Sequence, residues 1–193
     1  MLSDCVEKRI EQAISSGLRL VPPNSMNRYG AILSDLGFEE LTQSIVERVI
    51  EPFAKQAYPE VAACGLDAHH AFVVEYSPDT DDHLSWHVDD AEVTLNLCLG
   101  KVFSGGDLLF RGRRCAWHRD SAWSDNEVVQ LAHEPGIAII HAGANRHEAL
   151  PVVSGFRRNL IIWCMSNCYR ERVGQECPTW CPDHSNGRYS WNS

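Results

Sequence analysis

The segment SWHVDDAEVTLNLCLGKVFSGGDLLF, residues 85–110, contains two short apolar runs with a glycine-containing turn between them. Short apolar runs bounded by Gly, Asp, Asn and Pro are typical of β-strands. Four further runs of this kind follow residue 70, and they are FVVEY (72–76), VVQL (128–131), GIAIIHA (136–142) and NLIIWCM (159–165). Together they predict an antiparallel double sheet, of which the jelly roll, or double-stranded β-helix, hides its strand edges well. A single flat sheet with helices on one face is the alternative.

The first third of the chain is predicted to be helical. Apolar residues recur every four positions in two segments, at Val6, Ile10 and Ile14 and then at Leu41, Ile45, Val49 and Phe53. Gly17 and Pro59 are suitable stops for these two helices. We therefore divide the chain into a helical support region (1–66), a double-stranded β-helix core (67–167) and a Cys-rich tail (168–193).

The composition is that of an ordinary globular chain and narrows the class of function. The 193 residues are 44% hydrophobic and 22% charged, and the formal net charge of -9 argues against a protein that mainly binds a phosphate backbone. No run approaches the roughly 18 apolar residues of a membrane span, and the beginning MLSDCVEKRIEQAI does not resemble a signal peptide. We therefore expect a cytoplasmic or nuclear protein with no membrane partner, in which most of the eight cysteines are reduced.

Four residues form the candidate catalytic set. In an extended chain His87 and Asp89 point to the same side, so that both can reach one ion, and His147 follows the apolar run GIAIIHA. Two imidazoles and one carboxylate on one face of an iron ion leave the other face open for a bidentate co-substrate and dioxygen. Arg157, at the start of the last predicted strand, could bind a dicarboxylate with its two-pronged guanidinium group. A lone His-x-Asp is common by chance and can be a turn aspartate beside a surface histidine, but the four residues fall where separate strands would bring them together.

The sequence contains further histidines and arginines that could belong to a site. His141 lies inside the apolar run and is the alternative third ligand or a core histidine. The remaining candidates, His69, His70, His118 and His133, lack partners at ligand spacing and are predicted to be surface or capping histidines. The basic clusters, Arg111, Arg113 and Arg114 and then Arg157 and Arg158, are of a kind that usually forms a solvated surface.

The tail carries a possible structural zinc site. Cys168, Cys177, Cys181 and His184 make a set of four zinc-type ligands, although the C-x3-C spacing is looser than in most zinc knuckles. Unpaired thiols, or one disulfide, are the alternative.

The distal segment HEALPVVSGFRRNLIIW (147–163), taken with the His-x-Asp, resembles the catalytic domain of prolyl and lysyl hydroxylases of the 2-oxoglutarate oxygenase superfamily. The resemblance is closer to the "2-oxoglutarate and iron-dependent oxygenase domain-containing" proteins. The segments PPNSMNRYG (22–30) and 85–110 also look like that group, so the resemblance covers roughly residues 22 to 165. It implies that His87, Asp89 and His147 bind Fe(II) and that Arg157 binds the C5 carboxylate of 2-oxoglutarate, with ascorbate as the reductant.

The lysyl hydroxylase branch implies two further contacts to 2-oxoglutarate, from Tyr76 and Asn96. A phenol at the end of FVVEY can donate a hydrogen bond to a carboxylate, and a strand-end tyrosine that only packs its ring is the alternative. The Asn96 amide lies among apolar residues and needs partners, which the neighbouring backbone could also supply.

The implied reaction is hydroxylation of an aliphatic C–H bond with release of succinate and carbon dioxide, on the Lys or Pro side chain of a protein or peptide. Retention of Asp89 disfavours halogenation, whereas Leu84 and Ser85 depart from the tyrosine that collagen-type prolyl hydroxylases carry near this position. The alternatives are an oxygenase acting on a small metabolite or alkylated nucleic acid, and a non-catalytic metal-binding double-sheet domain. Specificity is expected in the loops 77–86 and 111–127, where the tryptophans could line a recognition groove or pack the loops down; they are Trp86, Trp117 and Trp123.

Overall fold

The computed structural model describes residues 2–173 and 177–184. The helices and helical turns are α1 (Leu2–Ser15), η1 (Ser34–Leu36), α2 (Glu39–Ile45), the π-helical turn η2 (Val46–Ile50), α3 (Glu51–Ala57), α4 (Pro59–Ala62), η3 (Ala116–His118), η4 (Asp125–Glu127) and α5 (Asn167–Val173). The strands are β1 (Gly30–Ile32), β2 (Ala68–Tyr76), β3 (Leu84–His87), β4 (Val93–Cys98), β5 (Phe103–Gly105), β6 (Leu108–Arg113), β7 (Val128–Leu131), β8 (Ala138–Ala142), β9 (Asn145–Ala149), β10 (Val152–Gly155) and β11 (Arg157–Met165). No helix within these residues is long and apolar enough to cross a bilayer.

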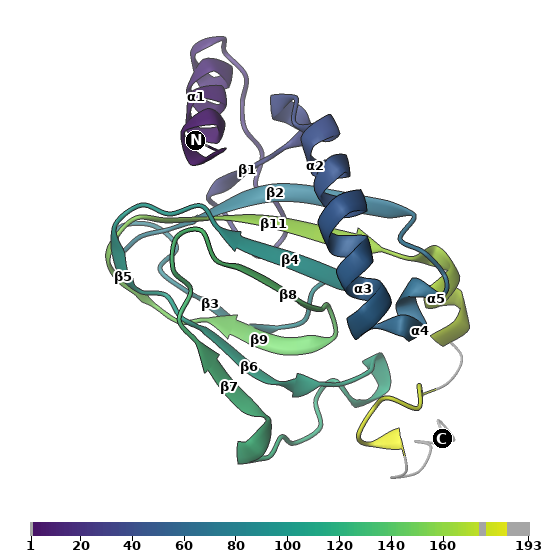
Figure 1. The fold of residues 1–193 in the computed structure, drawn as a ribbon. Coiled ribbons are helices and arrows are strands. Elements are labelled where there is room, and N and C mark those ends of the chain that lie inside the picture. The colour runs from purple at the N-terminus through teal and green to yellow at the C-terminus, as the bar shows by residue number, and fades with distance from the viewer. Residues whose placement is uncertain (1, 174–176, 185–193) are drawn as a thin grey trace, which may run out of the picture.

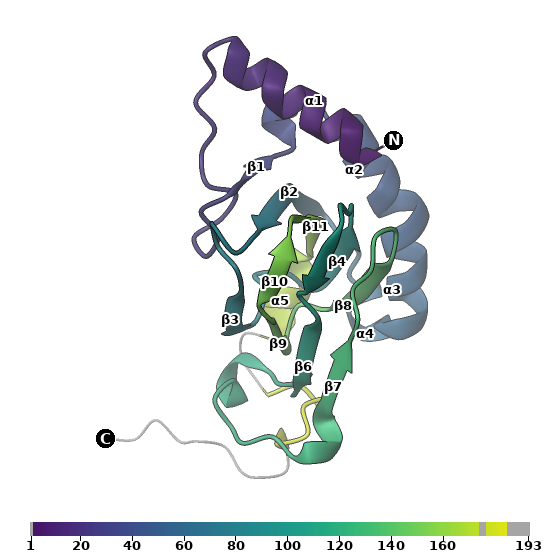
Figure 2. The same cartoon turned by 90° about the vertical axis from the view of Figure 1, so that its left-hand side faces the viewer.

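Two antiparallel sheets face each other and form the predicted jelly roll (Figures 1 and 2). The five-stranded major sheet has the order β1-β2-β11-β4-β8, and the four-stranded minor sheet has the order β3-β9-β6-β7. A short β10-β5 ribbon joins their ends. The helices α2 and α3 cover the outer face of the major sheet (Figure 1). The predicted double sheet is therefore confirmed, and the flat sheet is excluded.

Alternation along the central strands separates two layers of side chains. On β2, Val73 faces the helices, where it joins a core with Val46 and Ile50, while Phe72 and Val74 face the minor sheet. Successive side chains of a strand point to opposite faces, so each central strand contributes to both layers. The inner layer becomes polar toward one end, and this end forms the site described below.

The apolar residues that repeat every four positions in the second helical segment are not the stripe that packs on the sheet. Leu41, Val49 and Phe53 are 39%, 48% and 41% exposed, whereas Val46 and Ile50 are buried at 3% and 0%. The stripe that packs on the sheet also contains Thr42 and Ala54, which lie one position further along the chain. A threonine and an alanine give this stripe a weak apolar signal, so the neighbouring stripe of larger residues appeared to be the buried one.

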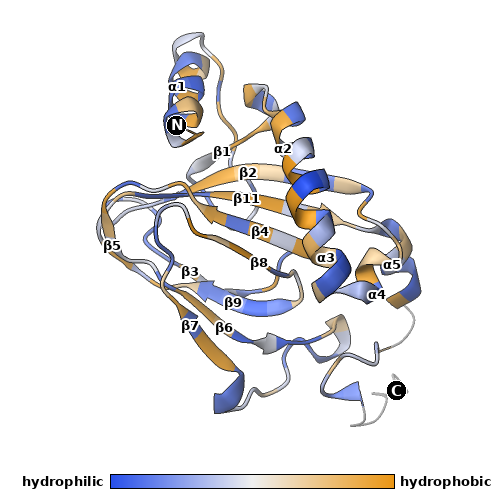
Figure 3. Ribbon diagram, in the orientation of Figure 1, coloured by the Kyte–Doolittle hydropathy of each residue, from blue (hydrophilic) through white to orange (hydrophobic). Residues whose placement is uncertain are grey.

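All six predicted strands are present, and five additional short strands were not predicted: β1, β3, β5, β9 and β10. Figure 3 shows the reason for β9, which is hydrophilic beside the apolar β8. Its sequence NRHEA has no apolar alternation, because its side chains serve the site and an ion pair rather than a core. Strand β9 is held between β3 and β6 by backbone pairing.

Candidate active site

Two facing strands and one turn bring the three predicted metal ligands together. His87 ends β3 directly opposite His147 of β9, and their imidazole rings are 4.2 Å apart between centroids. Asp89 follows β3 and is fixed by its backbone N–H, which donates to the Gly143 carbonyl over 3.0 Å. The chain passes so close that a Cβ on Gly143 would lie 1.8 Å from the Ala91 carbonyl oxygen, so this turn requires glycine.

The donor atoms of this triad converge. Asp89 Oδ1 lies 3.5 Å from His87 Nε2 and 3.8 Å from His147 Nε2, and the three ligand atoms lie within 4.8 Å of one another. Each imidazole places its Nδ1 2.9 Å from a backbone carbonyl, of Ser85 for His87 and of Asn145 for His147. A proton on Nδ1 leaves the Nε2 lone pair free for a metal.

The other carboxylate oxygen of Asp89, Oδ2, is held by the hydroxyl of Thr94 on the neighbouring major sheet. Thr94 Oγ1 on β4 donates to Asp89 Oδ2 over 2.6 Å, so Oδ1 is left to face the two imidazoles. Two nitrogens and one carboxylate oxygen, with their other polar atoms occupied by the protein, fit the requirements of a 2-His-1-carboxylate iron site.

Burial sets the charge state of the triad. It lowers the pKa of His147 to about 3, so that the imidazole is neutral near pH 7, which is the form that binds metals. Burial alone would raise the pKa of Asp89, but the neighbouring imidazoles of His147 and His87 outweigh it and the pKa lies below its ordinary value. The site therefore presents the neutral imidazole of His147 and the carboxylate of Asp89.

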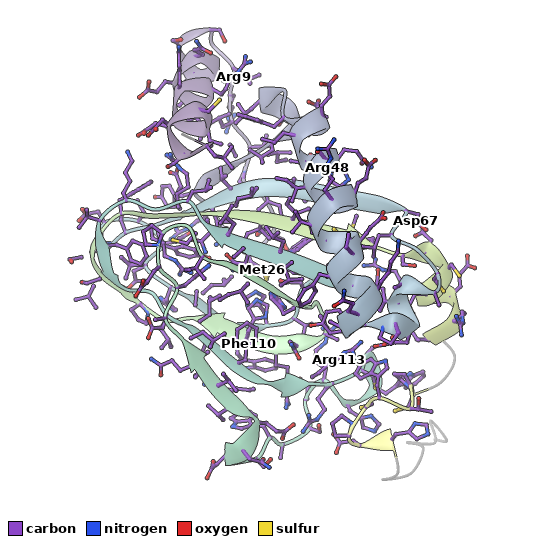
Figure 4. The ribbon with its side chains drawn as sticks, in the orientation of Figure 1. Arg9, Met26, Arg48, Asp67, Phe110 and Arg113 are labelled. Atoms are coloured by element: carbon purple, nitrogen blue, oxygen red, sulfur yellow. The ribbon has the colours of Figure 1, made fainter. Side chains whose placement is uncertain are left out.

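His141 faces the same carboxylate from another side. Its Nε2 lies 3.8 Å from Asp89 Oδ2, the oxygen already bound by Thr94. Burial lowers the pKa of His141, and its ring stacks edge-on against Phe110, which also packs on His147. Phe110 is labelled in Figure 4, on β6. The position of His141 thus supports His147 as the third ligand and His141 as a packing neighbour, although the assignment itself stays a prediction.

Arg157 lies in the same pocket as the triad. It begins β11 and is only 1% exposed. Its Nη2 contacts His133 Nδ1 at 2.8 Å, while Nε and Nη1 are buried and have no hydrogen-bonding partner in the described part of the chain. No ion pair joins it to a carboxylate of these residues, and burial accordingly lowers its pKa. A buried guanidinium with two free N–H groups fits a dicarboxylate whose other end is held at the metal.

Tyr76 and Asn96 line the same pocket. The Tyr76 hydroxyl accepts a hydrogen bond from Asn27 over 2.9 Å, so its own proton remains available for a ligand. Its ring lies 5.6 Å from the Arg157 guanidinium carbon. Asn96 Oδ1 accepts from Asn159 over 2.6 Å. Both predicted contacts to 2-oxoglutarate are sterically reasonable, and both remain predictions.

Sequence reasoning missed four polar residues that line this pocket, Asn24, Asn27, Thr94 and Asn159, and also His133, which contacts Arg157. His133 was predicted to be a surface or capping histidine, but it is 2% exposed and contacts Arg157 and Asn159. Burial, followed by the charge of Arg157, lowers the pKa of His133 to about 4. The ring is therefore neutral near pH 7 and can accept a hydrogen bond from the Arg157 guanidinium group. Only the polarity of Asn159 inside an apolar strand could have drawn attention to this group from the sequence.

The basic clusters do not form a solvated surface. Arg114, Arg157 and Arg158 are 5%, 1% and 4% exposed. Arg158 points away from the pocket and binds Glu75 at 2.7 Å, and Arg114 binds Glu127 at 2.6 Å. Strand alternation explains the difference between the adjacent Arg157 and Arg158, since the two face opposite sides of β11.

The tail ligands combine differently from the prediction. Cys177 and Cys181 do lie together, but their partners at ligand distance are Cys115 and His118. Cys168 instead lies with its sulfur 2.8 Å from that of Cys64, and His184 is exposed. Cys168 and His184 do not belong to the cluster, because Cys168 lies on α5 and His184 lies at the end of the turn 181–184. His118 was also misjudged, since it is 9% exposed and points into this cluster.

Residues 1–63 match the model of a family described as the OGFOD2-like domain. The chain is 44% identical over 183 residues to the 2-oxoglutarate and iron-dependent oxygenase domain-containing protein ICU11 of Arabidopsis thaliana, covering 94% of this chain and 46% of that protein. It is 39% identical over 160 residues to the 2-oxoglutarate and iron-dependent oxygenase domain-containing protein 2 of Homo sapiens, covering 82% and 43%. The chain is a relative of these oxygenase-domain proteins. The resemblance stated from the motifs is thereby confirmed.

The chain spans less than half the length of the oxygenase-domain proteins quoted above. Among solved structures, the fold is similar to a prolyl hydroxylase in complex with a hypoxia inducible factor oxygen degradation domain peptide fragment from Trichoplax adhaerens, at a TM-score of 0.56 and 14% identity, over 89% of this chain and 81% of that one. It is also similar to EvdO2 from Micromonospora carbonacea var. aurantiaca complexed with 2-oxoglutarate, at a TM-score of 0.51 and 17% identity, over 78% and 69%. At this level of identity the two structures support the jelly-roll fold alone.

Proposed function

We propose that this protein is an Fe(II)- and 2-oxoglutarate-dependent dioxygenase that hydroxylates an aliphatic C–H bond. The observation that carries the proposal is the placement of Arg157, a buried guanidinium with two unpartnered nitrogens, in one pocket with His87, Asp89 and His147. A structural metal site has no use for a dicarboxylate-binding arginine or for a face without protein ligands. The arrangement is suited to a metal that must bind a co-substrate as well as the protein.

In the proposed mechanism His87, Asp89 and His147 would hold Fe(II), and Arg157 would hold the far carboxylate of 2-oxoglutarate. When bound, this pair supplies the oxidising chemistry, with dioxygen as oxidant and succinate and carbon dioxide as products. The side chains of this chain orient the reactants: Thr94 fixes the carboxylate of Asp89, and the Tyr76 hydroxyl can donate a hydrogen bond to the co-substrate. Phe72, Ile161 and Trp163 give part of the pocket wall an apolar surface, which limits water on that side of the reacting atoms. Ascorbate as the reductant that keeps iron ferrous belongs to the same proposal.

The substrate we propose is a lysine or proline side chain of a protein or peptide. Two similarities support it: the chain is 27% identical over 154 residues to procollagen-lysine,2-oxoglutarate 5-dioxygenase 2 of Mus musculus, and the Trichoplax neighbour is bound to a peptide fragment. Trp86, the residue before the first ligand, is 43% exposed and offers a flat apolar surface next to His87 in the sequence. Trp123, by contrast, lies against Arg111 and Arg146 at 4.9 and 5.7 Å and is better suited to packing its loop.

The charges around the pocket disfavour alkylated nucleic acid as the substrate. Two arginines of the minor sheet are paired with carboxylates, since Arg111 pairs with Glu148, and Arg113 pairs with Glu60 at 2.9 Å. The third, Arg146, is buried and donates to backbone carbonyls. A phosphate backbone would have to displace these partners.

The proposal is tested by succinate formation from 2-oxoglutarate in the purified protein with Fe(II), ascorbate and air. Enzymes of this type turn over slowly without their substrate, so the wild-type protein is expected to form succinate and the Asp89→Ala variant is not. Lysine- and proline-containing peptide libraries are then screened for a mass increase of one oxygen atom. Equal succinate formation in both proteins, or none together with no binding of 2-oxoglutarate to the iron-loaded wild type, would refute the proposed activity.

A further inference from the structure

A second group of potential metal ligands lies away from the iron triad, where the C-terminal segment 177–184 meets the β6–β7 connection. It consists of Cys115 and His118 from that connection and Cys177 and Cys181 from the C-terminal segment. Figure 2 shows the yellow C-terminal segment beside the loop that joins β6 to β7. Its four ligand atoms lie within 4.8 Å of one another.

Local structure aims these side chains at one point. Cys115 follows the end of β6, and the turn η3 places His118 three residues later on the same side, with the His118 N–H donating to the Cys115 carbonyl over 3.0 Å. Cys177 and Cys181 are four residues apart around a turn in which the Cys181 N–H donates to the Pro178 carbonyl over 3.0 Å. Two short hairpin-like turns thus each supply two ligands, which is the construction of many structural zinc sites.

The distances fit a tetrahedral ion. His118 Nδ1 lies 3.4 Å from the Cys115 sulfur and 3.5 Å from the sulfurs of Cys177 and Cys181, and the sulfurs of Cys115 and Cys177 are 3.6 Å apart. With bonds of about 2.3 Å to sulfur and about 2.0–2.1 Å to nitrogen, a tetrahedral zinc site has edges of about 3.8 Å between sulfurs and about 3.6 Å between sulfur and nitrogen. A disulfide needs a separation of about 2.05 Å and would leave one thiol and the imidazole without a function. All the cysteines of the cluster are free.

We propose that Cys115, His118, Cys177 and Cys181 bind a structural zinc ion. Four protein ligands close the coordination shell and leave no position for a substrate, which distinguishes this site from the iron triad. On binding, the three thiols give their protons to solvent and zinc keeps its oxidation state, so that no oxidant is needed.

The neighbourhood of the cluster indicates what the ion would stabilise. Arg113, labelled in Figure 4, lies 3.7 Å from the Trp180 ring centroid, and Asp183 accepts a hydrogen bond from Ser121 over 2.6 Å. These contacts join the C-terminal segment to the β6–β7 loop on both sides of the four ligands. The ion would therefore fasten the C-terminal segment to the loop.

The loop is in turn tied to the strand that carries His147. Arg146 is 2% exposed, and its guanidinium donates to the carbonyls of Arg111 and Ser121 over 2.8 and 2.5 Å. Arg146 and His147 are neighbours on β9. Loss of the zinc ion is consequently expected to loosen the β6–β7 loop first and only indirectly affect the iron triad.

The test is metal analysis of the full chain expressed with zinc, in the wild type and in a His87→Ala/His147→Ala variant that removes the iron triad. We expect about one zinc ion per chain in the triad variant and up to two in the wild type, because the iron triad can also hold zinc. In the triad variant, Cys115→Ser and Cys181→Ser should lose the remaining ion, whereas the matched controls Cys168→Ser and His184→Ala, which alter residues outside the cluster, should retain it. Absence of zinc from the triad variant, or equal loss in Cys168→Ser, would overturn the proposal.

X-ray absorption at the zinc edge keeps the proposal testable if the cysteine variants fail to fold, because it uses the triad variant with all its cysteines. The expected shell has three sulfurs at about 2.3 Å and one nitrogen at about 2.0 Å. A shell of nitrogen and oxygen alone would overturn the proposal. Neither outcome depends on oxygenase activity, so this site can fail while the proposed function stands.

Discussion

Replacement of Arg157 by methionine tests co-substrate binding while leaving the three proposed metal ligands in place. The substitution keeps an unbranched side chain of similar length and removes the buried charge. Arg157 offers Nε and Nη1, neither of which has a partner in the described part of the chain. Two charge-assisted hydrogen bonds at about 1.5–3 kcal/mol each would contribute about 3–6 kcal/mol, which corresponds to a loss of about 10² to 10⁴ in affinity for 2-oxoglutarate.

The adjacent Arg158 supplies a matched control. It is as buried as Arg157, at 4% against 1%, but it faces away from the pocket and binds Glu75 at 2.7 Å. Arg158→Met should leave 2-oxoglutarate affinity unchanged and lower the free energy of unfolding by about 1–3 kcal/mol, because Glu75 loses its partner. Arg157→Met should show the reverse, with little loss of stability in the absence of 2-oxoglutarate, since it removes an unpaired buried charge.

The assay is anaerobic calorimetric titration of 2-oxoglutarate into the protein loaded with Mn(II), with metal affinity measured separately for each variant. Metal affinity should be nearly the same in all three proteins. An Arg157→Met variant that binds 2-oxoglutarate within threefold of the wild type would refute the assignment of Arg157.

Three further predictions concern the metal ligands and the pH dependence of stability. His147→Ala should abolish Fe(II) binding measured by titration, whereas His141→Ala should retain it; the opposite result would show that the ligand has been assigned to the wrong histidine. Thr94→Val removes the 2.6 Å hydrogen bond to Asp89 and should weaken Fe(II) binding about 10–100-fold, as losses of such supporting bonds commonly do; an unchanged affinity would show that the hydroxyl does not position the carboxylate. His133 has its pKa lowered by burial from 6.5 to about 4, so between these values the unfolded chain takes up a proton that the folded protein does not, and acid favours unfolding. At about 1.4 kcal/mol per pKa unit, His133 should lower the free energy of unfolding by about 3 kcal/mol by pH 4. The difference in unfolding free energy between the wild type and His133→Gln, measured by urea denaturation, should therefore shrink from pH 7 to pH 4. A difference that does not depend on pH would contradict this.

The strands of the core could be predicted from the sequence because their apolar residues are contiguous. Runs such as NLIIWCM signal a buried strand whatever the neighbours are. Strand β9 could not be recognised in this way, because the polar residues of NRHEA serve other purposes: His147 points into the site and Glu148 pairs with Arg111. The resemblance of the motif, rather than any strand signal, led to His147.

Partners that are distant in the chain limited the prediction of the sites. His133 was taken for a surface residue because its partners Arg157 and Asn159 lie 24 and 26 residues away in the chain. His118 has Cys115 three residues before it, but the other two members of its cluster are distant in the sequence, and it too was taken for a surface residue although the fold buries it. The zinc-type cluster shows the same limit, because Cys177 and Cys181 find their partners 62 and 63 residues away, at Cys115 and His118. Spacing alone suggested the nearer Cys168 instead.

An anaerobic crystal structure with Mn(II) and 2-oxoglutarate tests most directly whether metal and co-substrate bind in one pocket. We expect the metal to be bound by His87, Asp89 and His147, with the co-substrate's free carboxylate on Nε and Nη1 of Arg157. A metal held elsewhere, or a carboxylate bound to another residue while Arg157 stays unpartnered, would contradict it.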